Sequence, residues 1–292
     1  MSVRYAPSIQ ELASNADNAL TVCFRGILAR PGSQFEPLLP WLPGRVVGYQ
    51  DLGNSYDHAE MCESVLWLID WAVVSRTPVT LLGASMGGME IPFVIEAWRA
   101  RHPGQAPTWL RRVIMVDAPN GAATMKELPN WAAPLLISRP TGALLSSGFG
   151  DWVVNKMTKP PRPEEVAYPS KPTMRRVIGS VLTKHEWQEY VQQQAREGLS
   201  GYSGSLWWSW LHWMVSVGND GSYARACGAL RGTETWYLPC THEGNVTVDQ
   251  PAAYEWHAAH IDGLKKYAVH AVHCGFLQQP YALMEAFDHT IH

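Results

Sequence analysis

Short apolar runs recur along the chain, and segments with helical periodicity separate most of them. A strand that is buried on both faces shows such a run, whereas a strand with one wet face alternates apolar and polar residues. The pattern therefore predicts an α/β fold with a doubly wound, mostly parallel sheet. The predicted strands are residues 20–24, 45–49, 78–82, 113–117, 235–239 and 267–272.

Helical periodicity is clearest between the second and third predicted strands. Apolar residues at i, i+4, i+7, i+8 and i+11, counted from Met61, form a single stripe that a helix would bury. Pro92 is expected to bend or break the next helix early, and Pro280 is a start signal for the last one. The predicted helices are residues 57–75, 86–101, 173–197, 205–217, 251–264 and one that begins at Pro280.

The alternation of strands and helices stops between residues 124 and 231 and resumes afterwards. This stretch is rich in Pro, Gly and Trp, and it contains no clear buried strand. We therefore expect a core made of residues 1–123 and 232–292, interrupted by a helical, Trp-rich cap at residues 124–231.

Composition narrows the range of functions. Only 17% of the 292 residues are charged, the net charge is −3, and there is no long basic run, which argues against nucleic acid as a partner. The five Cys are dispersed without a C-x-x-C pair, as in a protein with reduced thiols. The sequence contains no signal-peptide-like start and no run of about 18 apolar residues, so we expect a cytoplasmic protein without a membrane span.

A candidate nucleophile follows the third predicted strand. Residues 83–87 read Gly-Ala-Ser-Met-Gly, a G-x-S-x-G motif between a strand and a helix. A serine hydroxyl presented on such a sharp turn needs glycine two positions before and after it, because the turn is crowded by neighbouring strands. The following helix directs its N-terminus toward Ser85, where backbone N–H groups can stabilise a developing oxyanion.

On these residues the chain resembles the α/β-hydrolase superfamily. Phe24-Arg-Gly-Ile27 is similar to the segment that usually reads His-Gly and supplies an oxyanion N–H, and residues 51–55 resemble the Asp-x-x-Gly-x-x-Ser stretch in shortened form. Residues 117–121 resemble the strand end that precedes a lid. The resemblance covers residues 18–123 and 232–292, and it implies a serine hydrolase.

The resemblance also implies a general base, because a serine nucleophile is weak without one. Residues 272–276 read Val-His-Cys-Gly-Phe and are similar to the terminal His-Gly-Phe segment of the family. His273 is therefore expected to be the base. His270 is the nearest rival, but it lies inside the predicted strand and is expected to be a buried residue.

In this family a carboxylate completes a triad with the serine and the histidine, and the sequence leaves several candidates for it. Matching residues 240–249 to the family's Gly-x-x-Asp pattern puts Asn245 where the acid belongs. Glu243 is favoured, since it follows directly after the strand and glutamate can serve as this group. Asp249, and Asp117 at the end of an earlier strand, are the alternative acids.

The resemblance places the oxyanion hole at the backbone N–H groups of Ile27 and Met86. Arg25 stands where the family often has His, and it could add positive charge or pair with a carboxylate. Four Trp lie within residues 207–213, more than one buried stripe requires. Trp207, Trp210 and Met214 lie at i, i+3 and i+7, a spacing that is more often packing of the cap within itself or against the core. The alternative is that some rings face a cavity, and Trp207 and Trp210 are the candidates for lining an apolar substrate site.

The expected function is hydrolysis of a carboxylic ester or thioester with an apolar acyl or aromatic group, through an acyl-enzyme. Acyl transfer and cofactor-free peroxidation on the same triad are alternatives, as is a non-catalytic binding protein. No cofactor is expected, and no metal, because the His pair at residues 257 and 260 lacks a third ligand at a telling spacing. The Trp content would also suit a homodimer.

Overall fold

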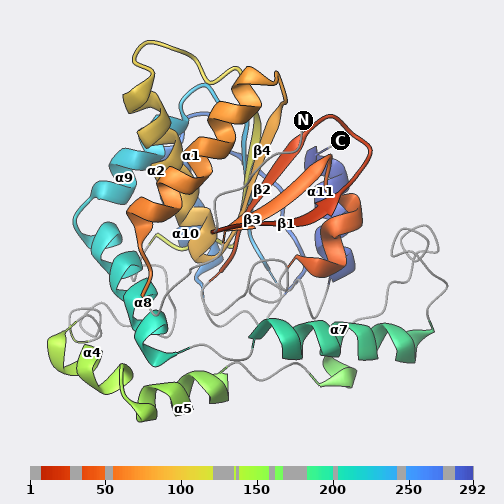
Figure 1. The fold of residues 1–292 in the computed structure, drawn as a ribbon, viewed down its shortest axis with the longest axis vertical. Coiled ribbons are helices and arrows are strands. Elements are labelled where there is room, and N and C mark those ends of the chain that lie inside the picture. The colour runs from red at the N-terminus through yellow and green to blue at the C-terminus, as the bar shows by residue number, and fades with distance from the viewer. Residues whose placement is uncertain are drawn as a thin grey trace.

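A central sheet dominates the structure, which is a computed structural model (Figure 1). The described residues are 8–26, 35–49, 55–120, 135, 138–157, 162–166, 183–199, 203–241, 248–271 and 280–291.

Seven strands form this sheet in the order β1-β3-β2-β4-β5-β6-β7. β1 runs antiparallel to β3, and every other neighbouring pair is parallel. This confirms the predicted mostly parallel, doubly wound sheet. The strands are β1 Ile9–Ser14, β2 Leu20–Phe24, β3 Arg45–Tyr49, β4 Val79–Ala84, β5 Leu110–Val116, β6 Thr235–Leu238 and β7 Lys265–Lys266.

Helices cover both faces of the sheet. In Figure 1, α1, α2 and α10 lie on one side of it and α11 lies on the other. None of the helices in the described ranges has a stretch long and apolar enough to cross a membrane. The α-helices are α1 His58–Val74, α2 Met86–Arg101, α4 Arg139–Leu145, α5 Gly148–Met157, α7 Lys184–Leu199, α8 Gly204–Asn219, α9 Ser222–Cys227, α10 Gln250–His260 and α11 Pro280–Ile291; the 3-10 helices are η1 Glu36–Trp41, η3 Pro163–Glu165 and η4 Gly228–Leu230.

Each central strand divides its side chains between two hydrophobic cores. In β4, Val79 and Leu81 belong to the core on the α1–α2 side, whereas Leu82 and Ala84 belong to the core on the α11 side. Because both faces are buried, consecutive residues can all be apolar, which is the pattern that predicted these strands.

Two strands at the sheet edges differ from expectation. β1 was not predicted, because an edge strand with one wet face has few buried residues, and only Ile9 among its six is fully buried. The predicted strand 267–272 is largely wrong: ladder pairing occupies β7, and beyond it only an isolated bridge joins Val269 to Cys240. The Ala271 N–H bonds to the Val269 carbonyl at 2.9 Å, so the chain turns there instead of continuing the ladder.

Pro92 does not break the helix that follows Ser85, contrary to the prediction, because α2 runs on to Arg101. Pro92 and its neighbours Ile91 and Phe93 are all buried in the core. Tertiary packing therefore holds this helix through the position where proline removes a backbone hydrogen bond.

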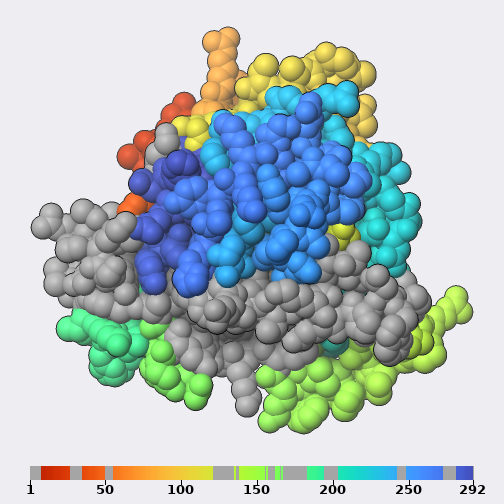
Figure 2. Space-filling view, turned by 180° about the vertical axis from the view of Figure 1, so that it is seen from behind, coloured from red at the N-terminus to blue at the C-terminus, as the bar shows by residue number. Residues whose placement is uncertain are grey.

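The region expected to form a cap, residues 124–231, contains α4, α5, η3, α7, α8, α9 and η4. Of these, α9 and η4 belong to the core on the α1–α2 side, where Tyr223 and Leu230 are buried. In Figure 1, α4, α5 and α7 lie below the sheet, and α8 rises from α4 and α5 along the core; seen from behind, the green atoms lie along the same end of the molecule (Figure 2). The predicted helix 205–217 is confirmed as α8, whereas only the second half of the predicted helix 173–197 falls in described residues, as α7.

A buried hydrogen-bonded pair joins α9 and α10. The Nδ1 of His257 is 2.7 Å from the Ala253 carbonyl, to which it donates, so Nε2 accepts from the Tyr223 hydroxyl at 2.8 Å. His257 is fully buried, and burial lowers the pKa of its imidazole from 6.5 to about 4. The folded protein therefore holds a neutral His257.

We expect this histidine to make stability depend on pH. Between pH 6.5 and about 4 the unfolded chain binds a proton at His257 that the folded protein does not. The free energy of unfolding should therefore fall as the pH decreases through this range, with this residue contributing on the order of 3 kcal/mol. Urea unfolding between about pH 7.5 and pH 4.5 measures the slope, and His257→Gln should make it shallower.

His185→Gln is the matched control, because His185 is exposed and its ion pair with Glu189 lies at the surface, where such a pair contributes at most about 1 kcal/mol to stability. An equal slope for the wild type and His257→Gln would contradict a neutral buried imidazole.

Candidate active site

The sheet has a topological switch point between β2 and β4. The chain leaves β2 toward β3 on one side, then crosses over to β4 on the other. In open parallel sheets, ligands bind outside the carboxyl ends of strands at such a point. Phe24 pairs with Gly83 in the parallel ladder, so the segments that begin at Arg25 and Ser85 leave the sheet side by side.

Ser85 occupies a strained turn at this edge. Its backbone has φ 53° and ψ −122°, outside the regions that a serine ordinarily adopts, and its N–H bonds to the Val116 carbonyl at 2.8 Å. The side chain is buried, with 7% of its surface exposed. Such a conformation costs on the order of 1–3 kcal/mol and is typical of functional positions.

Three glycines allow the turn to form, because each lies where a side chain would collide with backbone or packed atoms. A Cβ on Gly83 would lie 2.5 Å from the Gly87 carbonyl oxygen, and one on Gly88 would lie 2.6 Å from the Cβ of Ala118. A Cβ on Gly87 would lie 2.6 Å from the Arg25 carbonyl oxygen and closer still to that of Phe24. The two glycines of the G-x-S-x-G motif are thus packing requirements: Gly87 lets α2 approach β2, and Gly83 leaves room for Gly87.

No family model matches the sequence, and no curated protein sequence gives a significant match. Solved structures do match. MenH from S. aureus is 13% identical with TM-score 0.64, and the match covers 98% of each chain. The enol-lactonase from Burkholderia xenovorans LB400 and the bromoperoxidase from Bacillus anthracis are each 14% identical with TM-score 0.63, and cover 97% of this chain and 95% and 94% of their own. The protein has the α/β-hydrolase fold.

In this α/β-hydrolase fold, α2 begins directly after Ser85 with Met86. The helix N-terminus carries a partial positive charge and N–H groups without intrahelical partners, which suits a negative charge developing beside Ser85. The role of the Met86 N–H as an oxyanion donor stays a prediction. Ile27, the other predicted donor, lies outside the described residues.

Two of the three candidate acids are described. Asp117 follows β5, is completely buried and has φ 54°, and its N–H bonds to the Leu238 carbonyl at 3.0 Å. Asp249 is the N-cap of α10 and accepts from the Ala252 N–H at 3.3 Å, which stabilises that helix. Glu243, the favoured acid, lies outside the described residues.

His273 also lies outside the described residues, but the chain on its N-terminal side is described. The isolated bridge between Cys240 and Val269 and the bond from the Thr241 N–H to the Val269 carbonyl, at 2.8 Å, join the two chain segments. Residue 241 lies two positions before Glu243 and residue 271 two positions before His273, so the described chain leading to each of them runs side by side with the other. His270 is exposed, so the expectation that it is a buried residue is wrong.

The two tryptophans predicted to line the substrate site have different environments. Trp210 is completely buried, and the guanidinium of Arg25 lies over its ring, 4.5 Å from the centroid. Trp207 is half-buried and packs against the same core. α8 therefore brings Trp210 to the strand end beside Ser85.

A polar link that the sequence did not reveal joins α8 to the helix of the candidate nucleophile. The Tyr56 N–H donates to Ser209 Oγ and the Tyr56 hydroxyl donates to Glu90 Oε1, both at 2.7 Å. Glu90 lies in α2 and is only 3% exposed. The residues are far apart in the chain, and no local pattern signals their contact.

The described cysteines are poor alternatives to Ser85 as nucleophiles. Cys23, Cys62, Cys227 and Cys240 are buried free thiols, and burial raises the pKa of Cys62 and of Cys227 to about 12. A thiol with such a pKa is not ionised near neutral pH. Among the described residues, no three His, Cys, Asp or Glu side chains are grouped as a metal site would require.

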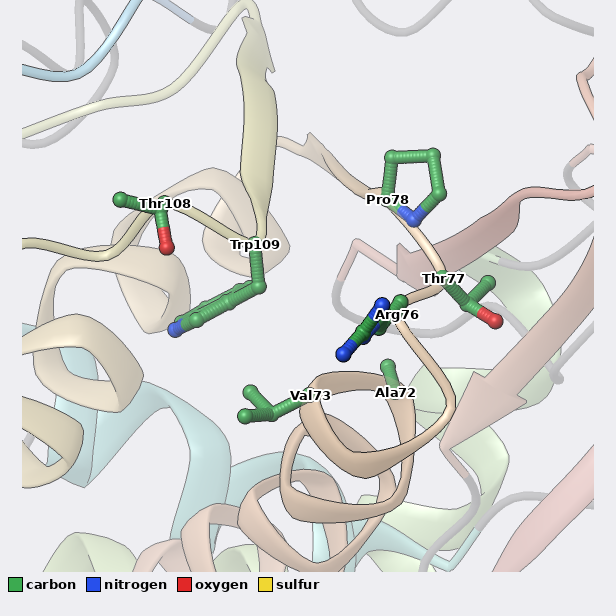
Figure 3. A pocket seen from close by; sticks show the side chains of 7 residues that line it. All are labelled: Ala72, Val73, Arg76, Thr77, Pro78, Thr108 and Trp109. Carbon is green, nitrogen blue, oxygen red and sulfur yellow. The ribbon is translucent and has the colours of Figure 1, made fainter.

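A pocket of about 260 Å³ lies at the other edge of the sheet, where β4 and β5 begin. Figure 3 shows the Trp109 indole and the Arg76 side chain around it, with Val73 of α1 nearby. Ser85 follows the opposite end of β4, so this pocket is not the candidate active site.

We expect Gly87→Ala to destabilise the protein by about 3 kcal/mol or more, because the new methyl group would collide with the backbone of β2. Urea unfolding measures the change. Gly228→Ala is the matched control: its φ is −61°, and no described heavy atom lies within 4 Å of the position of its Cβ. That variant should be unchanged or up to about 1 kcal/mol more stable. Equal stabilities of the two variants would contradict the close approach of α2 to β2.

Proposed function

We propose that the protein is a serine hydrolase that cleaves a carboxylic ester or thioester of an apolar acyl or aromatic substrate. The observation that carries the proposal is the strained backbone of Ser85, at φ 53°, between glycines at the switch point of the sheet. Strain of this kind persists only where surrounding structure enforces it, and it exposes a nucleophile to the carboxyl edge of the sheet.

In this proposal Ser85 Oγ forms a bond to the substrate carbonyl carbon while its proton passes to His273. The N–H groups of Ile27 and Met86 hold the oxyanion. The carbonyl then re-forms, the bond to the leaving alcohol or thiol breaks, and His273 returns the proton to that group. A water molecule repeats the sequence on the acyl-enzyme, which releases the acid and restores Ser85.

The described chain that precedes Glu243 and His273 supports their assignment as the acid and the base. Each follows a described segment by two positions, and the bond from Thr241 to Val269 holds these segments together. Asp117 is the alternative acid that the structure favours, because a fully buried carboxylate with a left-handed backbone is typical of a functional position. Asp249 already has a structural role as a helix cap.

Substrate class rests on the environment of α8. The half-buried ring of Trp207 suits an apolar acyl or aromatic group bound by burial. Trp210 is completely buried beneath Arg25 and supports this part of the helix from inside. The structural neighbours include an enol-lactonase, whose name denotes cleavage of a cyclic ester, and a bromoperoxidase, so cofactor-free peroxidation on the same residues is one alternative. Acyl transfer is the other, because an acyl-enzyme can pass its acyl group to an alcohol or amine in place of water.

Labelling with a fluorophosphonate probe tests the nucleophile and the base. The wild type should take up one label on Ser85, located by peptide mass spectrometry, and Ser85→Ala should take up none. His273→Ala should react at least about 100-fold more slowly, because the hydroxyl loses its general base. His270→Ala is the matched control and should react at the wild-type rate, since His270 is exposed on the neighbouring stretch of chain. A folded wild type that resists both large and small probes would refute the proposal and leave a binding protein.

Three isosteric variants identify the acid. Glu243→Gln should lower kcat/KM for a p-nitrophenyl ester by about 10³- to 10⁴-fold, because the imidazole loses the group that fixes its tautomer. Asp117→Asn and Asp249→Asn should change it by less than about 10-fold, and Asn at position 249 retains the helix cap. A large loss in Asp117→Asn instead of Glu243→Gln would assign the acid to Asp117.

A further inference from the structure

Arg25 is a buried cation at the candidate site. It directly follows β2, and only 5% of its surface is exposed. Removing a guanidinium from water is costly, so its buried position needs a physical reason. Two of its contacts, one from the side chain and one from the backbone, suggest what that reason is.

The side chain of Arg25 reaches the cap, and its backbone reaches the nucleophile turn. The guanidinium lies 4.5 Å from the ring centroid of Trp210, which is completely buried, so the cation–π contact is shielded from water. The carbonyl oxygen of Arg25 lies so close to Gly87 that a Cβ there would be 2.6 Å away. Arg25 thus connects α8 to the turn that carries Ser85.

Trp210, on whose ring Arg25 stacks, is itself held in place. One residue before Trp210, Ser209 accepts the Tyr56 N–H at 2.7 Å, and Tyr56 also donates to Glu90 in α2. Less than one turn later, the Trp213 indole stacks on His58 at 4.8 Å between centroids. Trp210 is therefore held from both sides by bonds and packing to the core.

The first half of α8 belongs to the cap instead. A Cβ on Gly142 of α4 would lie 2.6 Å from the Trp208 ring, and Gly204 approaches Gly150 of α5 so closely that its Cβ would lie 2.8 Å from the Cα. α8 therefore transmits the position of the cap to Arg25 through one continuous helix.

We propose that Arg25 is a positioning residue, which acts through its stack on Trp210 to hold the segment after β2 in place for the oxyanion. The inference rests on the proposed function, in which Ile27, two residues after Arg25, supplies an oxyanion N–H. An oxyanion hole accelerates the reaction only if its donors are preorganised, and a misplacement of about 1 Å can cost about 100-fold.

Steady-state kinetics with a neutral ester, p-nitrophenyl butyrate, test the proposal. Arg25→Gln and Trp210→Leu should each lower kcat by about 10- to 100-fold and change KM by less than about threefold, because the oxyanion forms only in the transition state. The double variant should be no worse than either single one, because both changes remove the same contact. Trp210→Phe keeps an aromatic face and should retain most of the kcat.

The control is a second Arg–Trp pair remote from the site. Arg45 lies over the Trp71 ring at 5.8 Å, and it begins β3 at the edge of the sheet opposite Ser85. Arg45→Gln should leave kcat and KM unchanged. Melting temperatures accompany every variant, and if Arg25→Gln does not fold, Arg25→Lys and Trp210→Phe decide, with Lys expected to lose kcat because it lacks the planar guanidinium.

Four outcomes overturn the inference. They are an unchanged kcat in the Arg25 and Trp210 variants, additive losses in the double variant, a kcat loss in Arg45→Gln of the same size, and a loss confined to an anionic ester such as mono-p-nitrophenyl succinate, which would make Arg25 a substrate-binding residue. Fluorophosphonate labelling of the wild type separates the two proposals. If Ser85 is labelled and Arg25 variants keep full kcat, only this inference fails, whereas an unlabelled Ser85 refutes both.

Discussion

The close approach of helix α2 to strand β2 is the constraint on which the arrangement at the carboxyl edge of the sheet depends. A side chain at Gly87 would collide with the backbone of Phe24 and Arg25, so backbone meets backbone there, while Gly83 leaves room for Gly87 and Gly88 leaves room for Ala118. Ser85, with φ 53°, lies directly before this contact, and the start of α2 faces the switch point. β2 and α2 are far apart in the sequence. They meet because the parallel ladder between β2 and β4 places the end of β2 next to the turn from which α2 begins.

Helix α8 is the second structural element at the site, and its aromatic residues have separate tasks. Trp208 packs against Gly142 of α4, Trp210 against Arg25 and Trp213 against His58. The aromatic side chains of α8 thus connect α4 on one side of the helix with the core on the other, because different faces of one helix can contact both (Figure 1). The hydrogen bond from the half-buried Tyr56 to the buried Glu90 links α8 to α2, because Tyr56 also bonds to Ser209 of α8.

Sequence patterns predicted the central strands well and the edges poorly. β2, β3, β4 and β6 are buried on both faces, so their apolar content alone distinguished them, and β5 was found at its buried half. β1 and β7 lie at the sheet edges, where little apolar surface is buried and turn geometry decides pairing. The helix break predicted at Pro92 is absent because packing of the buried residues around it outweighs the local cost of proline in a helix.

The candidate nucleophile was evident from five consecutive residues, since the steric demand of the turn is local and only glycine meets it. The acid was not, because a triad acid is defined by where its carboxylate lies relative to an imidazole far away in the chain. The burial of Asp117, the capping role of Asp249 and the stack of Arg25 on Trp210 arise only when distant segments pack. Local patterns encode which backbone shapes a segment can adopt, whereas burial and pairing depend on neighbours that the folded chain supplies.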